Sequence, residues 1–100
     1  MAETKKERYR RIRGAILKLL AHQHPGPLDI KEIHFLLDDL DLTIREEELK
    51  SHLCYLKEKG FVKIEERKSG GLSIEMIRIT ADGLNILDKF TKDVGISVEF

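Results

Sequence analysis

The apolar residues in the first sixty positions recur every three or four residues, which is the period of a helix that is buried on one side. Three such stripes follow one another along the chain: Tyr9, Ile12, Ile16, Leu19 and Leu20; then Ile33, Leu36, Leu37 and Leu40; then Leu49, Leu53 and Leu56. We therefore expect three amphipathic helices, the first over about residues 5–21. The prolines of "HQHPGP" end that helix, and Leu28 falls in a short extended stretch after it.

Each of these helices opens with a residue pair typical of a capping box, in which a small polar side chain and a glutamate three residues later both bind backbone N–H groups. The pairs are Thr4 with Glu7, Asp29 with Glu32, and Thr43 with Glu46. Gly60 fits the C-terminal stop of the third helix. Only the short "DLDL" joins the second helix to the third, which is the arrangement of a helix-turn-helix.

After Gly60 the apolar period shortens to about 2, the period of a strand. "FVKIEER" and "LSIEMIRIT" predict the two strands of a β-hairpin, with Gly70 and Gly71 in its turn. Thr80 then caps a fourth helix, "ADGLNILDKF", and "GISVEF" alternates apolar and polar residues. The expected fold class is α+β, mainly α, with three core helices, a β-hairpin and a C-terminal helix.

The length of 100 residues allows a single domain with one modest core. We expect that domain over residues 1–92, followed by a C-terminal tail over residues 93–100. The formal net charge is zero but unevenly spread: residues 1–20 hold seven basic and two acidic side chains, and residues 21–59 hold five basic and nine acidic ones. The whole chain therefore does not steer towards a polyanion, and any contact with nucleic acid must be local.

The sequence lacks the residues that several classes of function require. A single cysteine, Cys54, cannot form an internal disulfide, which favours a reducing intracellular compartment. No apolar run resembles a signal peptide or a membrane span, so we expect a cytoplasmic protein without a membrane partner. The histidines and Cys54 lack the spacing of a zinc site, no glycine-rich phosphate loop precedes a helix, and no catalytic triad can be argued from spacing. We expect no metal, no cofactor and no enzyme activity.

The element order, together with "CYLKEKGFVKIEE", the Gly-Gly turn and "IRITADGLNILDKF", resembles the winged helix-turn-helix superfamily. The likeness is greatest to small prokaryotic regulators of the multiple-antibiotic-resistance and padR-like type, and a fainter one is to winged-helix proteins of Mu-like prophages. The matching positions are Leu56, Lys59, Gly60 and Phe61 at the end of the third helix, and Thr80 and Gly83 after the hairpin, or wing. The likeness covers roughly Lys5 to Lys92 and implies a DNA-binding transcriptional regulator.

With its leucine stripe in the core, the third helix turns six positions outward: Glu47, Glu48, Lys50, Ser51, Cys54 and Tyr55. The resemblance implies that this helix enters the major groove of double-stranded DNA. Its contacts would be Lys50, Ser51 and Tyr55. The positive side chains that would hold phosphates are Arg67 and Lys68 on the wing and Arg10 and Arg11 in the first helix.

The first turn of the third helix carries Glu46, Glu47 and Glu48, although DNA is a polyanion. A helix N-terminus favours carboxylates by about 0.3–1 kcal/mol each, which gives these residues a structural reason. Adjacent glutamates at this position are nevertheless uncommon in a protein that reads bases. Two interpretations therefore stay open: a DNA-binding regulator, and a winged-helix protein-interaction module whose acidic third helix meets a basic protein partner.

The apolar face of the last helix is wider than one small core requires. On an ideal helical wheel Leu84, Ile86, Leu87, Phe90 and Val94 cover an arc of about 160°, whereas docking on a core needs about 100°. The alternating Ile96, Val98 and Phe100 follow. This surplus predicts either a homodimer through the last helix, with the tail as an extended dimer or docking strand, or a tail folded back on its own domain.

Overall fold

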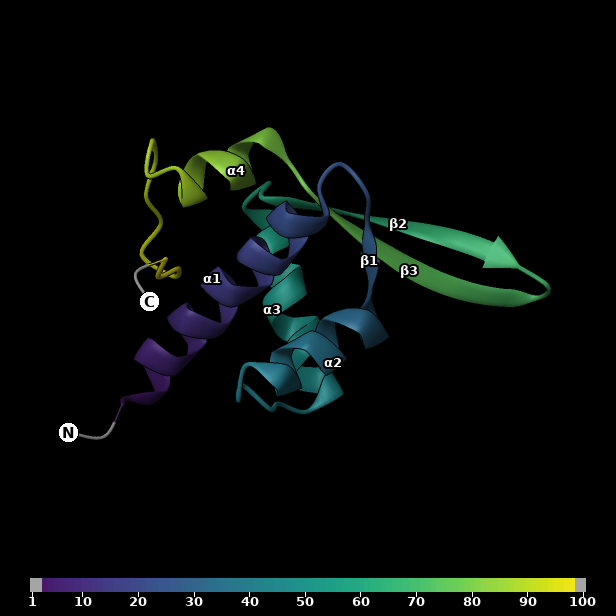
Figure 1. The fold of residues 1–100 in the computed structure, drawn as a ribbon, viewed down its shortest axis with the longest axis horizontal. Helices are drawn as coiled ribbons and strands as arrows, with labels where there is room; N and C mark the ends of the chain where they lie inside the picture. Colours follow the sequence, from purple (N-terminus) through teal and green to yellow (C-terminus); the bar gives the residue numbers. More distant parts are fainter. Residues whose placement is uncertain (1–2, 99–100) are drawn as a thin grey trace.

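The computed structural model describes residues 3–98, and over these residues the chain forms four helices and a three-stranded antiparallel sheet (Figure 1). In chain order the elements are α1 (Lys5–Gln23), β1 (Leu28–Asp29), α2 (Ile30–Asp39), α3 (Glu46–Glu58), β2 (Val62–Ser69), β3 (Leu72–Ile79) and α4 (Ala81–Leu87). The expected fold class, α+β and mainly α, is confirmed.

The helix starts agree with the expected caps in two of three cases. The Thr4 hydroxyl accepts a hydrogen bond from the Glu7 backbone N–H at 3.1 Å. Both bonds of the Asp29–Glu32 capping box are present, at 2.7 and 3.2 Å. The third expectation is wrong, because α3 has Arg45 as its N-cap and no side-chain cap bond.

The displaced start of α3 follows from packing. Leu42 and Ile44 are both buried, so the segment between α2 and α3 stays extended long enough to place both side chains in the core. Thr43, between them, faces outward, and its carbonyl accepts a hydrogen bond of 3.0 Å from the Arg8 guanidinium.

The sheet has the order β1-β3-β2. β2 and β3 pair from Val62 opposite Ile79 to Ser69 opposite Leu72, and Leu28 of β1 lies opposite Ile77. The inner half of the hairpin packs on the helices, and the outer half projects from the body of the molecule as the wing (Figure 1). The turn at its tip uses Gly70 and Gly71 at φ +57° and +82°, a conformation that side chains disfavour.

The core lies between the three long helices and the inner sheet. Its fully buried large side chains are Ile12, Ile16, Leu17, Leu20, Ile33, Leu37, Leu49, Leu53, Leu56 and Ile77. Most residues of the three predicted apolar stripes are among them. Leu40 is an exception, because it lies at the end of α2 and is 50% exposed.

The C-terminal region departs from the sequence expectation. α4 ends at Leu87, and Lys89 adopts φ +63°, so the helix does not run on to Phe90. The proposed apolar helix face is therefore wrong: Phe90 and Val94 lie in a loop and are 77% and 90% exposed. This early stop lets the chain turn back onto the domain.

The described part of the tail packs on its own domain. Ile96 is buried in the core, and the backbone N–H of Ser97 donates to the Arg10 carbonyl of α1 at 3.0 Å. Residues 96–98 form no strand, and Val98 is partly buried against the core. Phe100, which the sequence placed on the same alternating face, lies outside the described residues.

Candidate nucleic-acid interface

The outward face of α3 is set by the leucines on its inner side. With Leu49, Leu53 and Leu56 in the core, the residues that point away are Glu47, Ser51, Cys54 and Glu58, which follow one another at helical spacing. All four are exposed, and the Cys54 thiol donates to the Glu58 carboxylate at 3.6 Å. The most outward stripe of this helix therefore begins and ends with a carboxylate.

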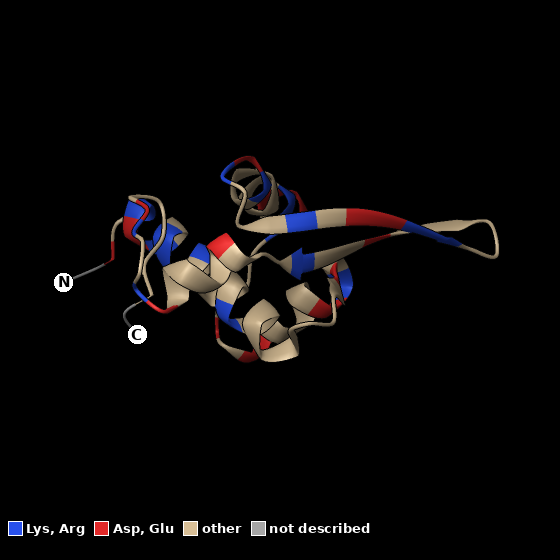
Figure 2. Ribbon diagram, turned by 90° about the horizontal axis from the view of Figure 1, so that it is seen from above, with Lys and Arg blue, Asp and Glu red and all other residues tan. Residues whose placement is uncertain are grey.

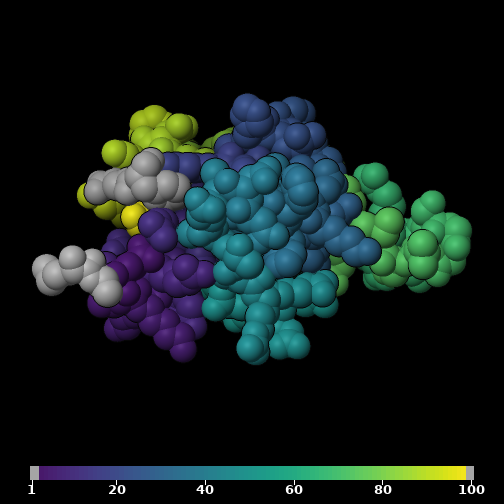
Figure 3. Space-filling view, turned by 60° about the horizontal axis from the view of Figure 1, so that its bottom comes forward, coloured from purple at the N-terminus to yellow at the C-terminus, as the bar shows by residue number. Residues whose placement is uncertain are grey.

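Lys50 lies on the side of α3 that faces the wing. It lines a hollow of about 360 Å³, which we call the wing hollow, together with residues of α2, its cap and β3. The lining residues are Asp29, Ile30, Lys31, Glu46, Lys50, Leu72, Ser73, Ile74 and Glu75. α3 and the wing thus flank one concave surface, and Figure 3 shows the wing standing out beside the surface that α2 and α3 form.

The two cations of the wing do not share a face. Arg67 pairs with Ile74 and Lys68 with Ser73, and successive residues of a strand point to opposite sides. Both side chains are exposed. Along β2 the charges run from the basic Lys63 near the body, through two glutamates, to Arg67 and Lys68 nearer the tip, and Figure 2 shows this order of basic, acidic and basic positions. A duplex on one side of the wing would therefore meet either Arg67 or Lys68 directly.

Tyr55 is directed into its own chain. Its hydroxyl donates to the Asp93 carboxylate in the loop after α4, and the Arg13 guanidinium lies 3.8 Å from the centre of its ring. Arg13 also donates to the Gly95 carbonyl at 3.3 Å. Tyr55 thus links α3 to α1 and to the C-terminal loop, and its hydroxyl is occupied within the domain.

The same contacts shift two acid–base equilibria. Burial and the hydrogen bond to Asp93 raise the pKa of the Tyr55 hydroxyl. Burial alone would raise the pKa of Asp93, but hydrogen bonds from Tyr55 and from the Gly95 N–H, with the Lys59 ammonium 3.6 Å away, hold it below its ordinary value. Asp93 is therefore a carboxylate at neutral pH.

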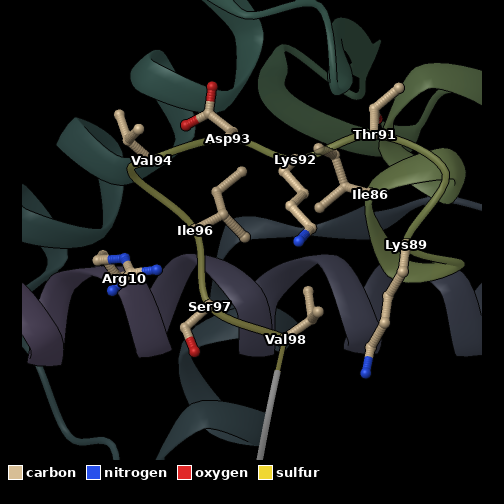
Figure 4. A pocket seen from close by; sticks show the side chains of 10 residues that line it. All are labelled: Arg10, Ile86, Lys89, Thr91, Lys92, Asp93, Val94, Ile96, Ser97 and Val98. Carbon is tan, nitrogen blue, oxygen red and sulfur yellow. The ribbon is translucent and has the colours of Figure 1, made fainter.

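Arg10 and Arg11 lie away from the wing. Arg10 lines a second hollow, which the loop after α4 encloses against α1 (Figure 4). Arg11 forms an ion pair of 3.1 Å with Glu3. In Figure 1 this part of α1 is at the end of the molecule opposite the wing, so the structure does not bring these two arginines together with Lys50.

The sequence did not predict two features near α3. Arg8 and Arg45 line a shallow hollow beside the start of the helix, next to Glu48, and add positive charge there. The second feature is His52, which is only 2% exposed. The sequence predicted that this histidine binds no metal, but it did not predict its burial. Its place three residues after Leu49, on the flank of the leucine stripe, is the signal that could have indicated burial.

His52 is held as a neutral side chain. Its Nδ1 atom accepts a hydrogen bond of 3.1 Å from Arg13 Nε, and the Tyr9 ring packs edge-on at 5.1 Å between centroids. Burial, together with the positive charges of Arg13 and Arg8, lowers its pKa to about 4. The proton of the neutral ring must then lie on Nε2, which has no hydrogen-bond partner and is 3.9 Å from the Glu48 carboxylate.

The described residues also limit other kinds of site. Within residues 3–98, no group of three or more histidine, cysteine or acidic side chains is arranged to hold a metal ion. In the same part of the chain, no helix is long and apolar enough to cross a membrane.

No protein-family model and no curated protein sequence matches this chain. Two similar solved structures are a PadR family transcriptional regulator from Eggerthella lenta DSM 2243 and Bacillus subtilis PadR in complex with operator DNA. The first has a TM-score of 0.64 and 21% identity, covering 79% of this chain and 70% of that one. The second has a TM-score of 0.66 and 20% identity, covering 79% of this chain and 46% of that one.

This chain thus spans less than half the length of the Bacillus subtilis protein it resembles. At such identities the likeness concerns the fold. It agrees with the resemblance seen in the sequence: the chain has the winged helix-turn-helix fold that PadR family transcriptional regulators share.

Proposed function

We propose that this chain binds double-stranded DNA as a transcriptional regulator, with α3 in the major groove and the wing against the backbone. The observation that carries the proposal is that Lys50 of α3 and the outer half of β3 line the same hollow, so helix and wing can act on one duplex. A fold neighbour was solved in complex with operator DNA, which supports DNA as the ligand. Lys50 and Ser51 are the proposed groove contacts, and Arg67 or Lys68 the proposed phosphate contact.

We propose fewer DNA contacts than the sequence predicted. Tyr55 is left out, because its hydroxyl is bonded to Asp93. Arg10 and Arg11 are left out as well, since they lie at the other end of the molecule (Figure 1). Few cations then remain to neutralise phosphates, so the salt dependence of binding should be shallow, with a slope of about −2 to −3 per copy.

A second function is favoured by one specific observation. The outward stripe of α3 contains Glu47 and Glu58 and no basic residue. Such a face suits a basic protein partner better than a phosphate backbone. In that case the winged helix would serve as a protein-interaction module.

Selection from genomic fragments tests the first proposal. The purified protein would be incubated with fragments at about 50 mM and about 200 mM salt, and the retained DNA sequenced. Recovery of one enriched sequence at both salt concentrations supports a regulator that reads DNA. No retention even at the lower concentration overturns DNA binding and leaves the protein-interaction module.

Charge substitutions at exposed positions sharpen this test. If DNA is the ligand, Lys68→Glu should weaken binding by about three- to tenfold at low salt and Glu47→Lys should tighten it by a similar factor. Lys6→Glu is the matched control, because it makes the same charge change at the exposed start of α1, at the end of the molecule opposite the wing. Equal losses for Lys68→Glu and Lys6→Glu would argue against a role for the wing.

A further inference from the structure

Most of the exposed large apolar side chains fall into two groups at opposite ends of the molecule. Within residues 3–98 the large apolar side chains that stand out to solvent are Phe35, Leu40, Leu72, Ile74, Phe90 and Val94. Phe35, Leu72 and Ile74 belong to α2 and the wing, whereas Phe90 and Val94 belong to the loop after α4 (Figure 1). Single exposed apolar residues are ordinary, but grouped ones indicate a contact surface.

The first group lies in an acidic setting. The wing hollow, with Leu72 and Ile74, adjoins a hollow beside Phe35, and the two share Asp29 and Lys31 in their walls. We call this combined surface the acidic groove. Its charged side chains are the carboxylates of Asp29, Glu32, Glu46 and Glu75 and the ammonium groups of Lys31 and Lys50, a net negative balance.

The second group lies in a basic setting. Residues 89–94, which we call the basic loop, present Phe90 at 77% and Val94 at 90% exposure, together with the exposed Lys89 and Lys92. The one acidic residue of the loop, Asp93, is turned inward and bonded to Tyr55, so it does not offset these lysines at the surface. In Figure 4 both lysines extend from the loop towards α1, and Val94 stands at the rim of the hollow.

We propose that the basic loop of one copy of this chain docks into the acidic groove of a second copy. Each surface combines exposed apolar side chains with a charge opposite to that of the other, so the docked pair buries apolar area while bringing unlike charges together. Two loops or two grooves would bring like charges together instead. The acidic groove includes the wing hollow, where the proposed duplex would lie, so a copy whose groove is occupied by a loop cannot bind DNA there. Because the contact joins different surfaces of the two copies, it closes into a dimer if each copy uses both, and otherwise extends into a chain.

Analytical ultracentrifugation of the full chain tests the docking without DNA. The surfaces are small, so we expect weak association that becomes visible between about 10 μM and about 1 mM protein. Raising the salt from about 50 mM to about 500 mM should weaken it, because exposed charges are screened. A chain that stays monomeric up to about 1 mM at low salt overturns the proposal.

Serine substitutions locate the contact. Phe90→Ser and Ile74→Ser should each weaken association by about tenfold or more, since each removes an apolar side chain from the centre of one surface. Leu40→Ser is the matched control: Leu40 is 50% exposed and lines neither the groove nor the loop. Thermal unfolding monitored by circular dichroism confirms that the variants remain folded. Association that survives both test substitutions, or that Leu40→Ser weakens equally, contradicts the docking.

A mixing experiment separates this docking from any other self-association. Phe90→Asp disables the loop and Ile74→Asp disables the groove, so each variant alone should be monomeric. Mixed in equal amounts they retain one intact loop and one intact groove between them, and should form a one-to-one pair and nothing larger. Failure of the two variants to pair overturns the proposal.

Discussion

Acidification should destabilise this fold through one residue, His52. The side chain is almost completely buried and is neutral at pH 7, with its Nδ1 atom accepting from Arg13. Protonation would place a second positive charge beside Arg13 and near Arg8, in a site that offers it little solvent. The Glu48 carboxylate, 3.9 Å from Nε2, is the facing group that would favour the charged ring, and it does not prevent the lowered pKa.

The size and direction of the effect follow from the two pKa values. His52 titrates at about 4 in the folded chain against an ordinary value of 6.5. Between these values the unfolded chain binds more protons than the folded one, so the free energy of unfolding falls as the pH falls. The full effect below both values is about 3 kcal/mol, and the part lost between about pH 7 and about pH 5 is about 2 kcal/mol. Asp93 has a depressed pKa as well, but its contribution is lost only at lower pH.

Urea unfolding at several pH values, for the wild type and for His52→Asn, measures this contribution. Asparagine keeps an oxygen that can accept from Arg13 Nε and removes the titrating ring. The wild type should lose about 2 kcal/mol between about pH 7 and about pH 5, while the variant should lose much less over the same range. An equal slope in both proteins would refute the reasoning, as would a folded-state titration of His52 near its ordinary pKa by NMR.

Two glycines test close approaches between elements. Gly83→Ala would push a methyl group into the Phe61 carbonyl oxygen. Urea unfolding should show that the free energy of unfolding falls by about 1–3 kcal/mol, even though alanine is the better helix former. An unchanged unfolding midpoint would show that α4 can shift freely. The methyl group of Gly95→Ala would overlap the Tyr55 hydroxyl and should release the loop from α3. The Tyr55 pKa, measured by the absorbance of the phenolate, should then return towards its ordinary value. A pKa that stays raised would contradict this.

The sequence predicted the elements whose signals are local. Three apolar stripes and the change of period at the hairpin identified α1 to α3 and the wing, since a helix or strand that docks by one face must carry that period. The start of α3 was missed because it depends on how deeply Ile44 is drawn into the core. The end of α4 was missed because the apolar spacing continues to Phe90, although the backbone turns at Lys89 and Ile96 takes the place in the core.

The candidate site was predictable to a similar degree. The exposure of Lys50 and Ser51 follows directly from the leucine stripe. The opposite faces of Arg67 and Lys68 follow from strand alternation. Tyr55 could not be placed from the sequence, because the partner that turns it inward, Asp93, is 38 residues away along the chain. Periodicity reports which side of an element is buried but not which distant segment covers it.

The acidic start of α3 now has a structural cause that bears on any test of DNA binding. This helix has no side-chain cap, so the positive end of its dipole is stabilised by the carboxylates of Glu46, Glu47 and Glu48 in the first turn. Glu47→Lys should therefore lower the free energy of unfolding by about 0.5–1 kcal/mol, whatever its effect on a ligand. A variant that unfolds more easily yet binds DNA more tightly would assign Glu47 to the helix start. A variant that unfolds more easily and loses a basic protein partner would assign it to recognition, and the two measurements on one protein decide between the functions.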